Sequence, residues 1–234
     1  MAFTLAAVSI LFYRLAPADL KRINLYQSVF YGALYDSPDV KADLDQLGLP
    51  ERLASFAKKT YFERDIGKSR EEADAVLAGD FYGRVSHGDV ALFYGKHPER
   101  LWGNLRFSAE NAFFVRPYYL GNFEKVEGKP PGALSYRFSG WSEFKRKVLP
   151  HQVGFILAVY AAYFGTATYQ WLRSKRGMQR VMIELYMLPG VIGVFAFVTP
   201  VLGDGRADMG KHLFLFNVCF DMMLVTGMIW ILLK

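Results

Sequence analysis

The stretches VGFILAVYAAYFGTATYQWL (153–172), VMIELYMLPGVIGVFAFVTPVL (181–202) and LFLFNVCFDMMLVTGMIWILL (213–233) decide the fold class of this chain. An α-helix rises about 1.5 Å per residue, so a helix of roughly 20 residues crosses the hydrocarbon core of a bilayer. Each stretch has about that length and is predominantly apolar. The pattern therefore predicts an integral membrane protein with three transmembrane helices near its C-terminus.

The remainder of the 234-residue chain is predominantly polar and is expected to form one soluble block. Its first segment, 2–13, is apolar but short, and no positive charge precedes it, which argues against a secretory signal peptide. We therefore predict a short or truncated fourth span over 1–16, an extracytoplasmic helical domain over 17–150 and a three-helix transmembrane region over 151–234. The predicted fold class is all-α, a membrane helical bundle with an outward-facing helical domain.

Helix signals recur within the polar block. Ser37 and Pro38 precede VKADLDQLG, which predicts a capped helix with a proline at its first position and a stop at Gly48. Similar signals predict further helices and one ordered loop, the helices at about 50–59, 70–77, 80–85 and 98–114 and the loop at 116–140. No stretch alternates strictly between apolar and polar residues, so no sheet is expected.

Positive charge orients the chain in the membrane. The link between the first two apolar stretches contains Arg173, Lys175, Arg176 and Arg180, and short basic links face the cytoplasm. Counting spans from that link puts the polar block outside the cytoplasmic membrane and both termini in the cytoplasm. Much of the formal net charge of +6 thus has a topological cause. No RNA-binding motif accompanies it, so nucleic acid is not expected as a partner.

Sequence motifs of the common catalytic chemistries are missing from the chain. The single cysteine, Cys219, lies in an apolar stretch, so no intrachain disulfide can form. The four histidines lack metal-ligand spacing, and the chain has no nucleophile elbow, phosphate-binding loop or dinucleotide fingerprint. The sequence therefore indicates no metal site and no cofactor, and it leaves a dependence on a divalent metal ion open.

Asp221 is the strongest local signal, because a carboxylate within an apolar span is costly to bury. Asn217 precedes it by four residues and shares its helix face, while Lys211 and His212 stand at the outer end of the same stretch. One interpretation is a polar track that leads to a substrate or lipid-phosphate site. The other is helix packing, in which Asn217 and Asp221 form hydrogen bonds to a neighbouring span.

A second polar cluster, RPYYLGN (116–122), lies in the predicted loop. The guanidinium of Arg116, next to two phenols and an amide, suits the binding of phosphate or sugar hydroxyls. The alternative is that Arg116 pairs with a carboxylate and anchors the loop. Aromatic residues of the polar block would suit either the outer leaflet or a small domain core, namely Trp102, Tyr118, Tyr119, Tyr136 and Trp141.

Three segments carry a resemblance to a known family, namely YGALYDSPDVKADLDQLGLPE (31–51), RPYYLGNFEKVEGKPPGALSYRF (116–138) and ADMGKHLFLFNVCFD (207–221). Over about 24–234 the chain resembles bacterial multispan membrane proteins of surface-glycan assembly, described as hexosyltransferases of S-layer-type glycans. Such proteins are similar to lipid-linked-sugar glycosyltransferases of the C type, which have an outward-facing active site and a polyprenyl-phosphate sugar donor.

The resemblance implies part of a polyprenyl-phosphate-sugar-dependent glycosyltransferase at the outer face of the cytoplasmic membrane. Its partners would be membrane lipids and the lipid-linked sugar, with other membrane subunits as a further candidate class. Enzymes of this type place a catalytic acid on the first outward loop, ahead of many more spans. This chain therefore resembles their C-terminal portion, and its catalytic residues are not assigned.

The resemblance also implies roles for the two polar clusters. Three residues would hold the lipid phosphate, namely Arg116, Lys211 and His212, and three would contact the sugar, namely Tyr118, Tyr119 and Asn122. Asp221 would order the cavity. The alternative function is a non-catalytic accessory or scaffold protein with an extracytoplasmic interaction domain, and a transporter is a third class.

Overall fold

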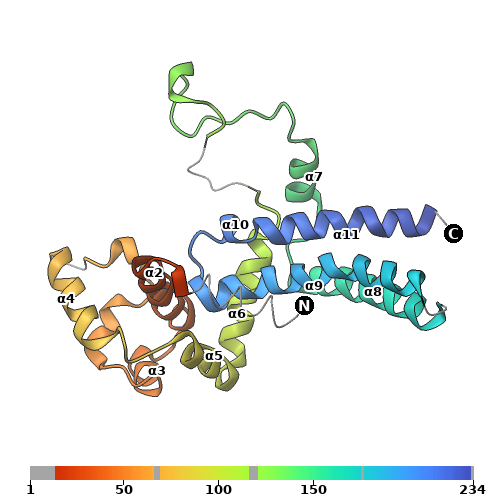
Figure 1. Cartoon of the computed structure of the whole chain (residues 1–234). Helices are drawn as coiled ribbons and strands as arrows, with labels where there is room; N and C mark the ends of the chain where they lie inside the picture. Colours follow the sequence, from red (N-terminus) through yellow and green to blue (C-terminus); the bar gives the residue numbers. More distant parts are fainter. Residues whose placement is uncertain (1–13, 66–68, 116–120, 175–176, 233–234) are drawn as a thin grey trace. The chain divides into compact units, whose positions relative to one another are not determined.

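The computed structural model describes residues 14–65, 69–115, 121–174 and 177–232. All regular elements of these residues are helical, and only an isolated bridge between Tyr82 and Val85 has β character (Figure 1). The all-α prediction is thus confirmed for the described part of the chain. The structure divides into two compact units, Met1–Leu101 with Leu202–Ala207 (unit 1) and Trp102–Val201 with Asp208–Lys234 (unit 2).

Unit 1 contains short helices around an aromatic core. Tyr26, Phe30 and Phe81 are fully buried, and the Phe30 ring lies 4.7 Å from Tyr26 and 4.9 Å from Phe81 between centroids. The elements that carry this core are α2 (Ala18–Ser28), the π-helix η1 (Val29–Ala33), α3 (Val40–Gln46), the 3-10 turns η2 (Glu51–Phe56) and η3 (Tyr61–Glu63), α4 (Arg70–Asp80) and α5 (His87–Lys96).

The segment Leu202–Ala207 closes on the α2–η1 junction at a position where only glycine fits. Gly205 has a φ of +62°, and a Cβ there would lie 2.6 Å from the carbonyl oxygen of Gln27. The Ser28 hydroxyl donates to the carbonyl of Leu202 at 2.7 Å. This close approach lets a segment from late in the sequence complete unit 1.

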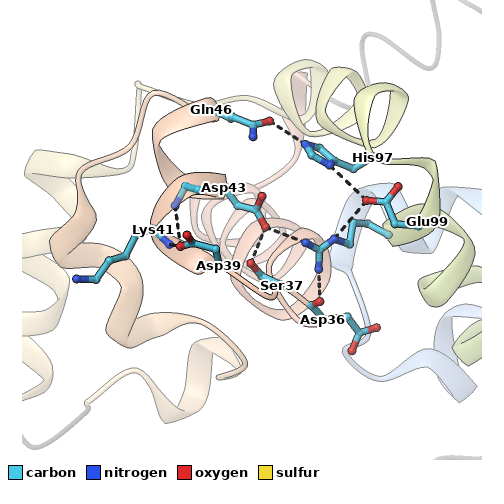
Figure 2. Close-up of polar contacts among 10 residues, drawn as sticks. Asp36, Ser37, Asp39, Lys41, Asp43, Gln46, His97 and Glu99 are labelled. Atoms are coloured by element: carbon cyan, nitrogen blue, oxygen red, sulfur yellow. Dashed lines mark hydrogen bonds and ion pairs between the residues drawn. The ribbon is translucent and has the colours of Figure 1, made fainter.

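Helix α3 begins at Val40, two residues later than the sequence predicts. Asp39 is its N-cap, and the Asp39 carboxylate accepts from the backbone N–H groups of Lys41 and Ala42. The predicted cap, Ser37, instead donates its hydroxyl to Asp43, and Pro38 lies before the helix (Figure 2). The predicted stop is confirmed, because the helix ends before Gly48, which has a φ of +69°.

The prediction of a helix at 80–85 is wrong. Helix α4 continues to Asp80, and a turn with the Tyr82–Val85 bridge follows it. Gly83 in this turn has a φ of +86°, a conformation that stops a helix.

A buried arginine ties α3 to α6 (Pro98–Asn111) within unit 1. The Arg100 guanidinium, 8% exposed, donates to the Asp43 carboxylate at 3.2 Å and to the carbonyl oxygen of Asp36. Figure 2 shows Asp43, Asp36 and Glu99 around this point. Because both charges of the Arg100–Asp43 pair are buried, removal of one would leave the other without compensation.

Replacement of Arg100 by methionine should therefore destabilise unit 1 by roughly 3 kcal/mol. Hydrogen–deuterium exchange of the purified protein in nanodiscs would show this as faster exchange in α3. Lys41→Met is the matched control, since the Lys41–Glu51 pair is 67% and 63% exposed and surface pairs contribute little. Equal protection of α3 in Arg100→Met and the parent protein would contradict the prediction.

A second ion pair in unit 1 makes its stability depend on pH. Arg64 donates from Nε to Asp74 at 2.6 Å and from Nη2 at 2.9 Å, and its guanidinium stacks on Tyr61 at 3.9 Å. The hydrogen bond from Arg64 lowers the pKa of Asp74 below its usual value of 3.8. The pair therefore stabilises the fold above about pH 4 and ceases to do so as the pH falls through the lowered pKa.

Asp74→Asn should therefore be less stable than the parent at pH 6, and the difference should shrink at pH values below about 4. Thermal unfolding followed by circular dichroism over this pH range measures both quantities. A difference that stays constant down to about pH 2 would show that the ion pair is not its cause.

Unit 2 contains the long apolar helices. Helices α8 (Val153–Arg173), α9 (Met178–Asp204) and α11 (Phe214–Leu232) run side by side (Figure 1). Tyr163 on α8 donates its hydroxyl to the carbonyl of Tyr186 on α9 and lies 3.1 Å from the Thr226 hydroxyl on α11. The other elements of this unit are η4 (Lys125–Glu127), α7 (Gly140–Val148) and α10 (Met209–His212).

Length and composition distinguish the three apolar helices. Helix α9 is long and apolar enough to cross a membrane by itself, and it continues through Pro189 and Pro200. Helices α7 and α8 pass the same test only as one span bent by 115°, and the apolar part of α11 is shorter. The helices thus form where the sequence predicts them, while the number of spans remains a prediction. The predicted span over 1–16 falls almost entirely outside the described residues.

Candidate functional site

A buried lysine is the centre of a polar cluster in unit 2. Lys145 of α7 is 2% exposed, and its ammonium donates to Asn217 Oδ1 at 3.0 Å and to both carboxylate oxygens of Asp221 at 2.9 and 2.8 Å. Asn217 and Asp221 both lie on α11. Since an ammonium has three protons and here meets three acceptor atoms, its hydrogen bonds are complete.

The same cluster reaches the end of α6. The Nδ2 group of buried Asn217 donates to the carbonyl oxygen of Ala112, immediately after α6. We call Lys145, Asn217 and Asp221 the polar hub. It joins the end of α6, α7 and α11, and it satisfies each polar group that it buries. The hub is therefore suited to hold helices together.

A cavity of about 490 Å³ lies between α6 and the start of α8. Trp102, Arg106 and Glu110 follow one another at intervals of four residues and so share one face of α6. The other wall consists of the residues that lead into α8 and begin it, His151, Gln152, Val153 and Gly154. Its size is within the range of small-ligand sites.

The wall at α8 offers several unused hydrogen-bonding groups. His151 Nδ1 donates to the Glu110 carbonyl at 2.9 Å, which leaves Nε2 as the acceptor of the neutral ring. That Nε2 is buried and has no hydrogen-bond partner among the described residues. The side chain of Gln152, the N-cap of α8, makes no capping bond, so it leaves the first N–H groups of the helix available to another acceptor.

The wall at α6 supplies a cation and an aromatic ring. No ion pair joins Arg106 to another residue in the described ranges, and the Trp102 side chain is 49% exposed. The same wall also carries the carboxylate of Glu110. Arg106 can bind an anionic group, while Trp102, Glu110 and the neutral groups of the other wall suit a polar ring attached to it. In the part of the chain that the structure describes, no cluster of three or more His, Cys, Asp or Glu could hold a metal ion.

Comparison with known proteins identifies the family. A family model described as the YfdI N-terminal transmembrane domain matches residues 1–234. The chain belongs to this family. No curated protein and no solved structure matches it.

As a YfdI N-terminal transmembrane domain, the chain is a membrane protein, which agrees with the predicted membrane localisation. The description refers to an N-terminal domain, whereas the sequence resemblance led us to expect a C-terminal portion. The family description names neither a hexosyltransferase nor an S-layer glycan, so these stay predictions, as do the topology and the position of the termini.

Two residues predicted to bind the lipid phosphate, Lys211 and His212, do not line this cavity. Lys211 and His212 belong to the short helix α10, where Lys211 is exposed and His212 half-buried. Asn217 and Asp221 do share a helix face, as predicted, and both bind Lys145. Their partner is thus the short helix α7, where the packing interpretation expected a neighbouring span.

The predicted loop cluster is described only in part. Arg116, Tyr118 and Tyr119 lie outside the described residues. The Asn122 side-chain oxygen accepts from the backbone N–H of Ser135 at 2.9 Å, and the backbone N–H of Asn122 donates to the Ala133 carbonyl at 2.9 Å. The Asn122 oxygen therefore contributes to closing the loop.

Sequence reasoning missed Lys145, Arg106, Glu110 and His151. A signal for Lys145 was present, because the apolar residues of WSEFKRKV (141–148) recur at helical spacing and Lys145 directly follows one of them, Phe144. The cavity had no such signal, since Arg106 and His151 are far apart in the sequence and meet only in the fold.

All three protons of Lys145 are used in the polar hub. Removal of the Lys145 charge alone should therefore destabilise the fold more than removal of the Lys145 and Asp221 charges together. Lys145→Met leaves the Asp221 carboxylate without its cation and should lower stability by roughly 3 kcal/mol, whereas Lys145→Met with Asp221→Asn should recover part of that loss. The thermal midpoint of aggregation of the detergent-purified protein ranks the stabilities of the parent, the single variant and the double variant. A double variant that is less stable than Lys145→Met would contradict the assignment of the hub as a coupled pair.

Proposed function

We propose that this chain takes part in surface-glycan assembly by binding a polyprenyl-phosphate-linked sugar at the membrane surface. One observation carries the proposal, namely the cavity between α6 and the start of α8, which combines the Arg106 cation, the Trp102 ring and unused hydrogen-bonding groups. A sugar phosphate needs these groups, because its phosphate is anionic and its ring has hydroxyls on an apolar frame.

In the proposed complex one set of lining residues binds the phosphate and another set contacts the sugar. Arg106 and the first N–H groups of α8 bind the phosphate, since the N-terminus of a helix carries partial positive charge. Trp102 stacks against the sugar ring, and Glu110 and His151 Nε2 accept hydrogen bonds from its hydroxyls. The polyprenyl chain remains in the bilayer beside the apolar helices.

The predicted residues of the loop and of α10 have a place in the same proposal. Lys211 and His212 of α10 would approach the lipid phosphate from the membrane side, together with Arg116. Tyr118, Tyr119 and Asn122 would contact the sugar from the loop. The glycosyltransferase of the C type remains the predicted activity, with no catalytic residue assigned, and the non-catalytic accessory protein remains its alternative.

Binding of a polyprenyl-phosphate hexose, radiolabelled in the sugar, to the chain in nanodiscs tests the proposal. Arg106→Gln should weaken binding about tenfold or more, because it removes a hydrogen-bonded charge from the phosphate. Trp102→Ala should weaken binding of the hexose conjugate and leave that of sugar-free polyprenyl phosphate unchanged.

Arg173→Gln is the matched control, since it removes the same charge from the opposite end of α8. Unchanged binding in both Arg106→Gln and Trp102→Ala would exclude the cavity as the site. Release of the labelled sugar by the bound complex would favour the enzyme, and binding without release would favour the accessory role.

A further inference from the structure

Helix α7 leaves a compact apolar surface without a partner in the described part of the protein. Trp141, Phe144 and Val148 are 48%, 44% and 60% exposed. At the helical spacing of about 100° per residue they fall within an arc of about 60°. The rings of Trp141 and Phe144 stack with centroids 5.5 Å apart and planes 15° apart, which makes one continuous face.

The opposite face of α7 is charged. Glu143 forms ion pairs with Arg146 at 2.7 Å and with Lys147 at 3.0 Å, so two cations share one carboxylate and this face is positive. An aromatic face opposite a basic one is the pattern of helices that lie in the headgroup region of a bilayer and prefer anionic lipids.

The angle between α7 and α8 agrees with such a position. Helix α7 is bent by 115° from α8 across a short break. If α8 follows the membrane normal, the axis of α7 lies within about 25° of the membrane plane. Helix α7 would then turn the chain from the membrane surface into the apolar helix α8.

The polar hub sets the depth of α7. Asn217 and Asp221, which bind Lys145, lie three and seven residues after Phe214, the first residue of α11. At about 1.5 Å per residue these positions are about 5–10 Å along the helix axis, the depth at which interfacial helices bury their apolar face. Lys145 borders the apolar arc, so the hub and the exposed face lie at the same level.

We propose that α7 is an interfacial helix whose Trp141, Phe144 and Val148 insert into the surface of a bilayer containing anionic phospholipids. The hub holds the helix at this level, and Arg146 and Lys147 face the phosphate groups. This surface is distinct from the cavity and does not depend on the proposed sugar ligand.

Spin labels on the full chain test the depth of the two faces. In a Cys219→Ser background, single labels at Phe144→Cys, Val148→Cys and Lys147→Cys are compared in nanodiscs that contain phosphatidylglycerol. Labels at 144 and 148 should collide more with oxygen than with a water-soluble nickel complex, and the label at 147 should show the reverse. The ratio of the two collision rates should differ at least severalfold between the faces.

Two results would overturn the proposal. Equal access of the nickel complex to labels at 144 and 147 would place the aromatic face in water. Labels at 144 and 148 that are immobile and protected from both reagents would show that protein covers this face, either a second copy or another subunit. As a control for the fold, each labelled variant should keep the polar hub. The hydrogen–deuterium exchange of α11 should then match that of the parent protein.

Discussion

The buried ammonium of Lys145 is the interaction on which the arrangement of unit 2 depends. An isolated charge in an apolar environment is too costly to persist, so α7 must remain where Asn217 and Asp221 supply three acceptor atoms. Asn217 extends the same constraint to the end of α6 through the Ala112 carbonyl. Three elements from distant parts of the sequence are thereby held together, and α7 in turn leads directly into α8.

The same constraint holds the two walls of the cavity in place. Helix α6 supplies Trp102, Arg106 and Glu110, and the start of α8 supplies His151 and the uncapped N–H groups. The hub anchors α6 directly and α8 through α7, while the His151–Glu110 hydrogen bond joins the two walls themselves. The chain belongs to a transmembrane domain family, and a lipid-linked ligand is the occupant that we propose for this cavity.

The sequence predicts those features that depend on local composition. The apolar stretches mark α8, α9 and α11, and the glycine signal marks the end of α3. Asp221 and Asn217 stand out because polar groups are costly in an apolar helix, yet their partner could not be predicted, since its position is set by tertiary packing. The prediction of Ser37 as the cap of α3 was wrong, because Asp39 caps the helix and the Ser37 hydroxyl donates to Asp43 instead.

The cavity could not be predicted from the sequence either, because tertiary packing brings its two walls together. Its cation and its histidine are ordinary residues in the sequence, and they gain significance only when α6 and α8 meet. The loop cluster that looked most suitable for a ligand contains Asn122, whose oxygen is used within the loop. Proximity in the sequence could not show that this oxygen makes an internal contact.

The most direct test of the central claim is photocrosslinking with a polyprenyl-phosphate hexose that carries a diazirine on the sugar. The chain in nanodiscs would be irradiated, digested and analysed by mass spectrometry. Binding in the cavity predicts labelled peptides from α6 around Trp102–Glu110 and from His151–Gly154 at the start of α8, with loss of label when unlabelled conjugate competes. Competable label confined to other segments, or no competable label at all, would contradict the assignment of the cavity as the sugar-phosphate site.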